Sequence, residues 1–267
     1  MQILIIGGGN MGSTYAQSFV RSHITNKKNM MILEKSPEKA VELSTKDIGS
    51  VYGHAEECIP QADLIILAVK PQDIGKLFND IRPFVTKNQV FLSIMAGVKI
   101  SSICAALDVK KVIRAMPNLP AQIGAGMTAF TATDEVTRLE LDMIQNLLNT
   151  TGKTVYVEQE HMIDATTAIS GSGPAYVYFF MEAMIQAAEA MGFSQSEAEL
   201  LVNQTFMGAL DLYSKSDLSC SEWISRVASK GGTTEAALLS FKKNALHQDI
   251  IDGANAALNR AIELGNE

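Results

Sequence analysis

The feature that most constrains this chain is a glycine-rich turn between an apolar strand and a helix. Residues 7–12 read GGGNMG and fit the pattern G-x-G-x-x-G through Gly7, Gly9 and Gly12. The turn follows the apolar run Ile3–Ile6 and precedes a stretch with apolar residues every four positions. In such a unit the backbone N–H groups and the helix N-terminus receive a pyrophosphate. The context predicts a dinucleotide site in which Gly7 permits the tight turn, Gly9 lets phosphates approach, and Gly12 lets helix and strand pack closely.

The rest of the first half predicts the sheet that carries this turn. Short apolar, β-rich runs alternate with amphipathic stretches, which indicates buried parallel strands covered by helices on both faces. We therefore expect an α/β fold with a Rossmann-like, doubly wound, mostly parallel sheet. Residues 127–131 and 154–157 flank a further helical pattern and are expected to extend the sheet. The expected main strands are residues 3–6, 30–33, 64–69, 90–94 and 112–114.

The sequence pattern and the charge balance change near residue 158. Beyond it the strand pattern ends, and S-x-x-E capping boxes begin helices at Ser194 and Ser219. Residues 1–158 carry 16 basic and 15 acidic side chains, whereas residues 159–267 carry 6 and 14. We predict a dinucleotide-binding domain over 1–158 and an all-helical substrate-binding and dimerisation domain over 159–267. Its wide apolar stripes favour dimerisation, with a closed monomeric bundle as the alternative.

Composition excludes several other classes of protein. A net charge of −7 has the wrong sign for a protein that tracks nucleic acid or an anionic membrane. The longest purely apolar stretch, Leu64–Val69, is too short to span a bilayer, and the strand at Ile3 leaves no room for a signal peptide. We therefore expect a cytoplasmic location. The histidines and the three cysteines show no metal-ligand spacing, and no G-x-S-x-G elbow occurs, so a hydride-transfer enzyme using a soluble nicotinamide cofactor remains.

The choice between NAD and NADP stays open in the sequence. Glu34 follows Gly12 by 22 residues, near the spacing of a carboxylate that binds the adenosine ribose, and this favours NAD. Lys35 and Ser36 come next, and a cation with a hydroxyl can hold a 2′-phosphate if Glu34 turns away. Lys35 can equally be a solvated surface cation.

Two further segments follow predicted strands. Ala68-Val69-Lys70-Pro71 ends the third main strand, and the carboxyl ends of parallel strands are where ligands bind in open α/β sheets. Lys70 is therefore expected to face the cofactor cleft, although a lysine at a strand exit is also ordinary. Residues 114–120, RAMPNLP, contain two prolines three apart, which make a stiff loop suited to shaping the nicotinamide end of the cleft.

Two segments of the helical half resemble anion or substrate sites. Residues 170–174, SGSGP, and residues 229–234, SKGGTT, each offer hydroxyls and N–H groups at a predicted helix start. Such a start binds a carboxylate well. Both segments can also be simple capping turns.

Taken together, these segments resemble Δ1-pyrroline-5-carboxylate reductase, the family that performs the last step of proline biosynthesis. The resemblance covers nearly the whole chain, from Gly7 to beyond Leu239. The stretch SKGGTTEAAL resembles the family signature. The motifs that carry the resemblance are GGGNMG at 7, AVKPQ at 68, AGV at 96, RAMPNLPAQIGAGMTA at 114, SGSGPAY at 170 and SKGGTTEAAL at 229.

The resemblance implies that the chain reduces the C=N bond of the substrate with hydride from NADPH or NADH. It implies an active site across an intertwined homodimer, with dimers often joined into decamers. By motif, the cofactor would be bound by Gly7, Gly9, Asn10, Met11, Gly12, Ala68, Val69, Lys70, Pro71, Met116, Pro117 and Asn118. The spacing after Gly12 adds Glu34, Lys35 and Ser36 as candidate cofactor residues at the ribose. The substrate would be bound by Ser229, Gly231, Gly232, Thr233 and Thr234, with Thr234 as the catalytic residue at the ring nitrogen.

Two other functions remain as alternatives, and three residues depart from the family pattern. A β-hydroxyacid dehydrogenase shares the architecture, but its G-x-x-x-N-K pattern is absent. A nucleotide-binding regulator without catalysis is the other alternative, and the intact Thr234 argues against it. Lys230 stands where the family usually has Pro, Leu119 where Thr is usual, and Glu34 where many relatives are neutral or basic.

Overall fold

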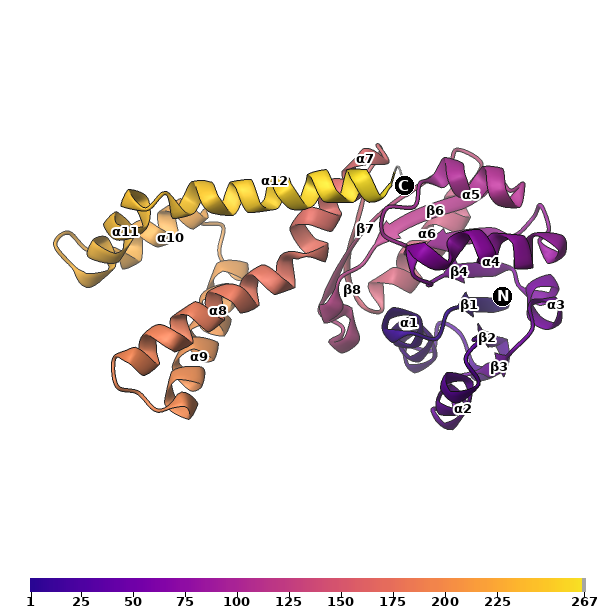
Figure 1. Cartoon of the computed structure of the whole chain (residues 1–267), viewed down its shortest axis with the longest axis horizontal. Helices are drawn as coiled ribbons and strands as arrows, with labels where there is room; N and C mark the ends of the chain where they lie inside the picture. Colours follow the sequence, from indigo (N-terminus) through magenta and orange to yellow (C-terminus); the bar gives the residue numbers. More distant parts are fainter. Residues whose placement is uncertain (266–267) are drawn as a thin grey trace. The chain divides into compact units, whose positions relative to one another are not determined.

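The computed structural model describes residues 1–265 and contains two compact units (Figure 1). One unit comprises Met1–Ser172 and the chain from Ala257 onward, and the other comprises Gly173–Ala256. These limits differ from the predicted domains 1–158 and 159–267. The difference arises because helix α7 (His161–Thr166) buries Ile163 and Asp164 within the first unit.

The first unit is built on an eight-stranded sheet in the order β3-β2-β1-β4-β5-β6-β7-β8. All neighbouring strands are parallel except β6 and β7, which are antiparallel. The expected Rossmann-like fold is thus confirmed, and the two later runs extend the sheet as predicted. The strands are β1 (Ile3–Ile6), β2 (Met30–Leu33), β3 (Ser50–Tyr52), β4 (Leu64–Leu67), β5 (Val90–Ser93), β6 (Val112–Met116), β7 (Gly126–Ala132) and β8 (Gly152–Tyr156).

Helices cover both faces of this sheet. Along β1, Ile3 and Ile5 pack into the core beneath α1, α2 and α6, whereas Leu4 and Ile6 pack into the core beneath α3, α4 and α5. This alternation explains why the strands are apolar throughout, since each strand is buried on both sides. The helices of this layer are α1 (Asn10–Arg21), α2 (Pro37–Thr45), α3 (Ala55–Cys58), α4 (Ile74–Ile81), α5 (Ile100–Leu107) and α6 (Arg138–Asn149). Short 3-10 turns are η1 (Lys27–Asn29), η2 (Ile59–Gln61), η3 (Pro71–Asp73), η4 (Arg82–Phe84) and η5 (Leu119–Ile123).

The register brings the carboxyl ends of the central strands to one edge. Ile6 at the end of β1 is opposite Leu33 of β2 and Leu67 of β4, and Leu67 is opposite Ser93 of β5. The segments after these strands therefore meet at the edge where ligands bind in open α/β sheets.

The second unit is helical. Its helices are α8 (Gly173–Ala190), α9 (Gln195–Ser214), α10 (Cys220–Val227), α11 (Thr233–Lys243) and most of α12 (Leu246–Leu264). Both predicted capping boxes are present, Ser194 with Glu197 and Ser219 with Glu222. Helix α8 has no buried residue. Large apolar side chains exposed on α8 and α9 include Val177, Tyr178, Phe179, Met184, Leu200, Leu201, Met207 and Leu210. A single chain therefore leaves wide apolar faces of this unit uncovered.

Candidate active site

The glycine turn after β1 is shaped by close backbone packing. Gly7 has φ +102°, and a Cβ there would lie 2.7 Å from the Ala68 carbonyl oxygen. A Cβ on Gly12 would lie 2.0 Å from the Gly7 carbonyl oxygen, so only glycine allows α1 to start this close to β1. At Gly9, the N-cap of α1, an added Cβ would meet nothing within 4 Å. The turn is thus closed on the protein side and open on its outer side, as a pyrophosphate requires.

Glu34 is fixed beside this turn. Its Oε2 accepts a hydrogen bond from the Gly8 N–H at 3.0 Å, and its Oε1 accepts one from the Ser36 N–H at 2.9 Å. Ser36 in turn caps α2, where its hydroxyl accepts from the Lys39 N–H. The carboxylate therefore ties the end of β2 to the glycine turn.

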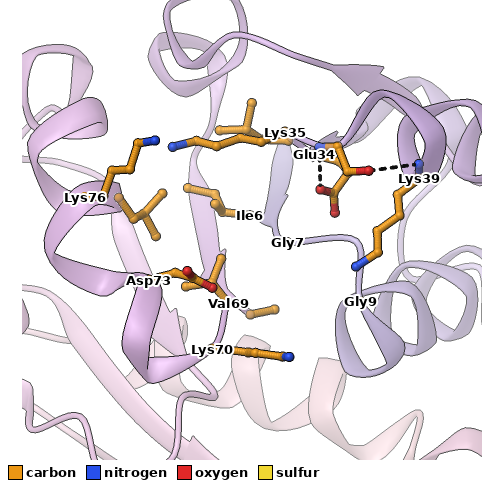
Figure 2. Close-up of a pocket in the computed structure, with 14 residues that line it drawn as sticks. Ile6, Gly7, Gly9, Glu34, Lys35, Lys39, Val69, Lys70, Asp73 and Lys76 are labelled. Carbon is orange, nitrogen blue, oxygen red and sulfur yellow. Dashed lines mark hydrogen bonds between the residues drawn. The ribbon is translucent and has the colours of Figure 1, made fainter.

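A cavity of about 460 Å³ opens at this edge of the sheet (Figure 2). Most of its lining consists of the segments that follow β1, β2 and β4, and its open glycine backbone and lysines suit a phosphate-bearing dinucleotide. The predicted cofactor residues that line it are Gly7, Gly9, Glu34, Lys35, Ser36, Ala68, Val69 and Lys70.

The cavity also holds ionisable residues that the sequence analysis missed. Lys39 comes from α2, Asp73 from η3, and Lys76 from α4. The sequence did contain a signal for Lys39, because a residue three positions after a helix-capping serine lies in the first turn, next to the cap. No sequence pattern around Lys76 indicates that this residue lines the cavity.

Other predicted cofactor residues lie outside the lining of this cavity. Asn10, Met11 and Gly12 form the first turn of α1, and Pro71 begins η3. Met116, Pro117 and Asn118 lie at the exit of β6.

The segment that follows β6 is hydrogen-bonded to a π-helical turn, η6 (Thr167–Gly171). The Asn118 side-chain amide donates to the Ser170 carbonyl at 3.0 Å, and its oxygen accepts from the Met127 N–H at 2.8 Å. In a regular helix that carbonyl would accept from the N–H of residue 174, but Pro174 has none. Asn118 therefore satisfies a carbonyl that the helix leaves open. A Cβ on Gly171 would lie 2.9 Å from Met116 Cε, so Met116 packs directly on this turn.

A buried cation anchors the same strand. Arg114 on β6 is 1% exposed and forms ion pairs with Glu160 at 3.1 Å and Asp164 at 2.6 Å. Glu160 also accepts from the Ile100 N–H at 2.8 Å. Arg114 thus links the sheet to α5 and α7 just before the Met116–Asn118 segment.

Residues 170–174 span the junction of two helical segments. Helix α8 begins at Gly173, as the sequence suggested, but the π-helical turn η6 precedes it and the Ser172 N–H donates to the Thr167 carbonyl at 2.9 Å. That N–H is therefore used within the chain, and sequence periodicity did not indicate the π turn before α8. The anion site suggested for this segment stays a prediction.

Residues 229–234 do form a turn that begins a helix. Gly231 has φ +74°, Gly232 is the N-cap of α11, and Thr233 and Thr234 are its first residues. The Gly231 N–H donates to the Glu235 carboxylate at 2.7 Å, and the Gly232 N–H donates to the Ser229 carbonyl at 3.0 Å. Within residues 1–265, the Thr233 and Thr234 N–H groups have no hydrogen-bond acceptor. The turn therefore holds one internal carboxylate and presents two further donors at a helix N-terminus.

No described helix is long and apolar enough to cross a membrane. No group of three or more His, Cys, Asp or Glu residues among the described positions could hold a metal ion.

Comparisons with known proteins agree across both units. A family model described as pyrroline-5-carboxylate reductase dimerisation matches residues 160–264, and one described as NADP oxidoreductase coenzyme F420-dependent matches residues 2–97. The pyrroline-5-carboxylate reductase of Staphylococcus aureus is 31% identical over 100% of this chain and 98% of its own. That of Staphylococcus haemolyticus is 30% identical over 99% of this chain and 98% of its own.

Solved structures give the same result. A pyrroline-5-carboxylate reductase from Coxiella burnetii is 30% identical, with a TM-score of 0.89 over 98% of both chains. The Plasmodium falciparum pyrroline carboxylate reductase, solved with NADP bound, is 27% identical, with a TM-score of 0.89 over 99% of this chain and 98% of that one.

The fold and the cavity define an oxidoreductase that uses a nicotinamide dinucleotide, NADH or NADPH. Its helical unit matches a dimerisation domain, so the uncovered apolar faces of α8 and α9 belong to a region of self-association. The chain belongs to the pyrroline-5-carboxylate reductase family.

Proposed function

We propose that this chain reduces the C=N bond of Δ1-pyrroline-5-carboxylate to give L-proline, with hydride from NAD(P)H, as the last step of proline biosynthesis. The observation that carries the proposal is the presence in one chain of a dinucleotide cavity and a glycine-threonine turn at a helix start. Membership of the family supports it at both ends of the chain.

The predicted cofactor residues would contact different parts of the dinucleotide. The open side of Gly9 and the first turn of α1, with Asn10 and Met11, would receive the pyrophosphate. Ala68, Val69, Lys70 and Pro71 would follow the cofactor toward its nicotinamide, with Met116, Pro117 and Asn118 bordering that end. Since the Asn118 amide already serves two backbone groups, its part would be to hold the loop in place. NAD(P)H, when bound, supplies the hydride that adds to the imine carbon.

The glycine-threonine turn would hold the substrate. Thr233 offers an N–H at the start of α11, where the helix dipole favours a carboxylate, and Ser229 lies at the same turn. Gly231 and Gly232 shape the turn, and the carboxylate of Glu235 already occupies the Gly231 N–H. For the predicted Gly232 contact, that N–H has to leave the Ser229 carbonyl.

The proposed reaction needs little acid or base catalysis from the chain. A protonated imine is already electrophilic, so positioning supplies most of the acceleration. Thr234 would hydrogen-bond the ring nitrogen, which already carries its proton when the carbon receives hydride. The addition gives a neutral amine, which then takes a proton from solvent. Thr234 is half-buried in the first turn of α11.

Replacing Thr234 by alanine is expected to lower kcat by on the order of 10- to 100-fold, because one hydrogen bond to the reacting nitrogen is lost. The dissociation constant for NADP⁺, measured by calorimetry, should stay unchanged. Thr234→Ser keeps the hydroxyl and should restore most of the activity. Full activity in the alanine variant would remove Thr234 from the proposed role.

The reaction itself is tested by following NADH and NADPH oxidation in parallel with Δ1-pyrroline-5-carboxylate, with proline identified as the product. Turnover with either cofactor supports the proposal. Cofactor binding without turnover, from folded protein, favours the non-catalytic alternative, and exposed Lys230 and Leu119 then become the first positions to revert to the family residues.

We further propose that the chain forms homodimers through its helical unit, that dimers join into decamers, and that the protein works in the cytoplasm without nucleic-acid or membrane partners. The exposed apolar residues of α8 and α9 support the dimer. Light scattering at micromolar protein distinguishes monomer, dimer and decamer by mass.

A further inference from the structure

The start of helix α11 differs from the starts of α6, α9 and α10. Each of those three helices begins with a capping box, in which a Ser or Thr at the N-cap is followed three residues later by a Glu. The glutamate carboxylate accepts the N–H of the N-cap residue at 2.8 or 2.9 Å in all three. Helix α11 has Glu235 at the same position but Gly232 at its N-cap, so no side-chain hydroxyl caps its first turn.

Glu235 binds one residue further back than a glutamate of a capping box does. The Gly232 N–H already donates to the Ser229 carbonyl at 3.0 Å, and the Glu235 carboxylate accepts from the Gly231 N–H at 2.7 Å. This short distance is typical of a charge-assisted hydrogen bond. Because Glu235 belongs to α11 and Gly231 precedes it, the bond ties the turn to the helix that the turn begins.

Packing does not hold Gly231 in place. The residue is exposed, and a Cβ added there would meet nothing within 4 Å. Its φ of +74° lies in the left-handed region, which glycine enters and leaves without a steric penalty. The next residue is also a glycine. The conformation of the turn therefore depends on hydrogen bonds, and half-buried Glu235 supplies the acceptor for Gly231.

We propose that Glu235 is a positioning residue for the substrate carboxylate, because it holds the turn in the conformation that leaves the Thr233 and Thr234 N–H groups open. The Glu235 carboxylate and the Ser229 carbonyl take the two glycine donors, so the first open donors are those of α11 itself. A preformed turn avoids the entropy cost of ordering two glycines when the substrate binds. The inference rests on the proposed use of this turn to hold the carboxylate of Δ1-pyrroline-5-carboxylate.

Steady-state kinetics of Glu235→Ala at saturating cofactor test the proposal with two substrates. The KM for Δ1-pyrroline-5-carboxylate should rise about tenfold, because the turn would adopt its binding conformation only part of the time, while kcat stays nearly unchanged. Δ1-Pyrroline has the C=N bond but no carboxylate, so its kcat/KM should be the same in the variant and the natural chain. Glu235→Gln keeps an oxygen that can accept from the Gly231 N–H and should recover most of the lost affinity.

Glu222→Ala provides the matched control. Glu222 holds the same position in α10, where its carboxylate accepts the Ser219 N–H at 2.8 Å. Its removal should lower the melting temperature about as much as the removal of Glu235 and leave the KM for Δ1-pyrroline-5-carboxylate unchanged. An equal rise in KM in both variants would mean that lost helix stability alone weakens substrate binding, and the proposal would be overturned.

Three further results would contradict the proposed role of Glu235. An unchanged or lower KM in Glu235→Ala would show that the carboxylate does not hold the turn for the substrate. An equal loss of kcat/KM with Δ1-pyrroline would show that the effect does not concern the substrate carboxylate. A loss that Glu235→Gln fails to recover would assign the effect to charge instead of the hydrogen bond. Absence of turnover by the folded natural chain would instead count against the proposed function.

Discussion

Gly12→Ala is expected to destabilise the fold and to abolish measurable cofactor binding. The added Cβ would lie 2.0 Å from the Gly7 carbonyl oxygen, and the obstacle is backbone that cannot rotate away. Overpacking of this kind costs about 1–3 kcal/mol or more, and relief by moving α1 would open the turn that receives the pyrophosphate. Thermal unfolding and NADP⁺ calorimetry on the same sample measure the two effects.

Gly9→Ala is the matched control three positions earlier in the same turn. An added Cβ there meets nothing within 4 Å, and the φ of −67° is ordinary for alanine. The melting temperature should therefore stay close to that of the natural chain, while cofactor affinity falls at least about tenfold because the methyl group occupies the path of the phosphates. If Gly12→Ala kept both its melting temperature and its affinity, the close packing of α1 on β1 would not be required.

The second large effect is expected at Arg114. Arg114→Met removes a cation that is 1% exposed and leaves the carboxylates of Glu160 and Asp164 without it. Breaking a buried pair by removing one partner costs about 3–5 kcal/mol, because the remaining charge is left uncompensated. Urea unfolding monitored by circular dichroism gives the change in the free energy of unfolding.

An exposed ion pair provides the comparison. Lys46→Met removes the partner of Glu42 on α2, a pair 2.8 Å apart with both side chains open to solvent. Its loss should change the free energy of unfolding by less than about 1 kcal/mol. Similar losses in the two variants would show that burial adds nothing to the Arg114 cluster.

The sequence was most informative where burial determines residue type. The runs that became β1, β2, β4 and β5 are buried on both faces, so their apolar character shows directly in the sequence. The edge strand β3 was missed because it has three residues and none of them is fully buried. The antiparallel direction of β7 depends on long-range pairing, which local sequence patterns do not record.

In the candidate site too, the sequence predicted what local structure determines and missed what depends on tertiary packing. Gly7, Gly9 and Glu34 were found from spacing, because a strand, a turn and a helix fix their places along a short piece of chain. Lys76 lies on α4 and reaches the cavity only through the packing of that helix against the sheet. The two hydrogen bonds that hold Glu34 also depend on tertiary structure, so the spacing that identified this residue could not reveal where its carboxylate points.

The contact between Asn118 and Ser170 has a consequence for how this chain can change over time. Pro174 withholds the N–H that the Ser170 carbonyl would otherwise receive, and Asn118 provides a substitute from 52 positions away. Asn118 therefore depends on Pro174: a mutation that replaces the proline gives the Ser170 carbonyl a possible helix donor, whereas loss of the amide alone leaves this carbonyl without its side-chain partner. Asn118→Ala should be better tolerated in a Pro174→Ala background, and a double-mutant cycle would measure that coupling. Among descendants of this sequence, the asparagine should therefore be lost together with the proline or after it, and not before it.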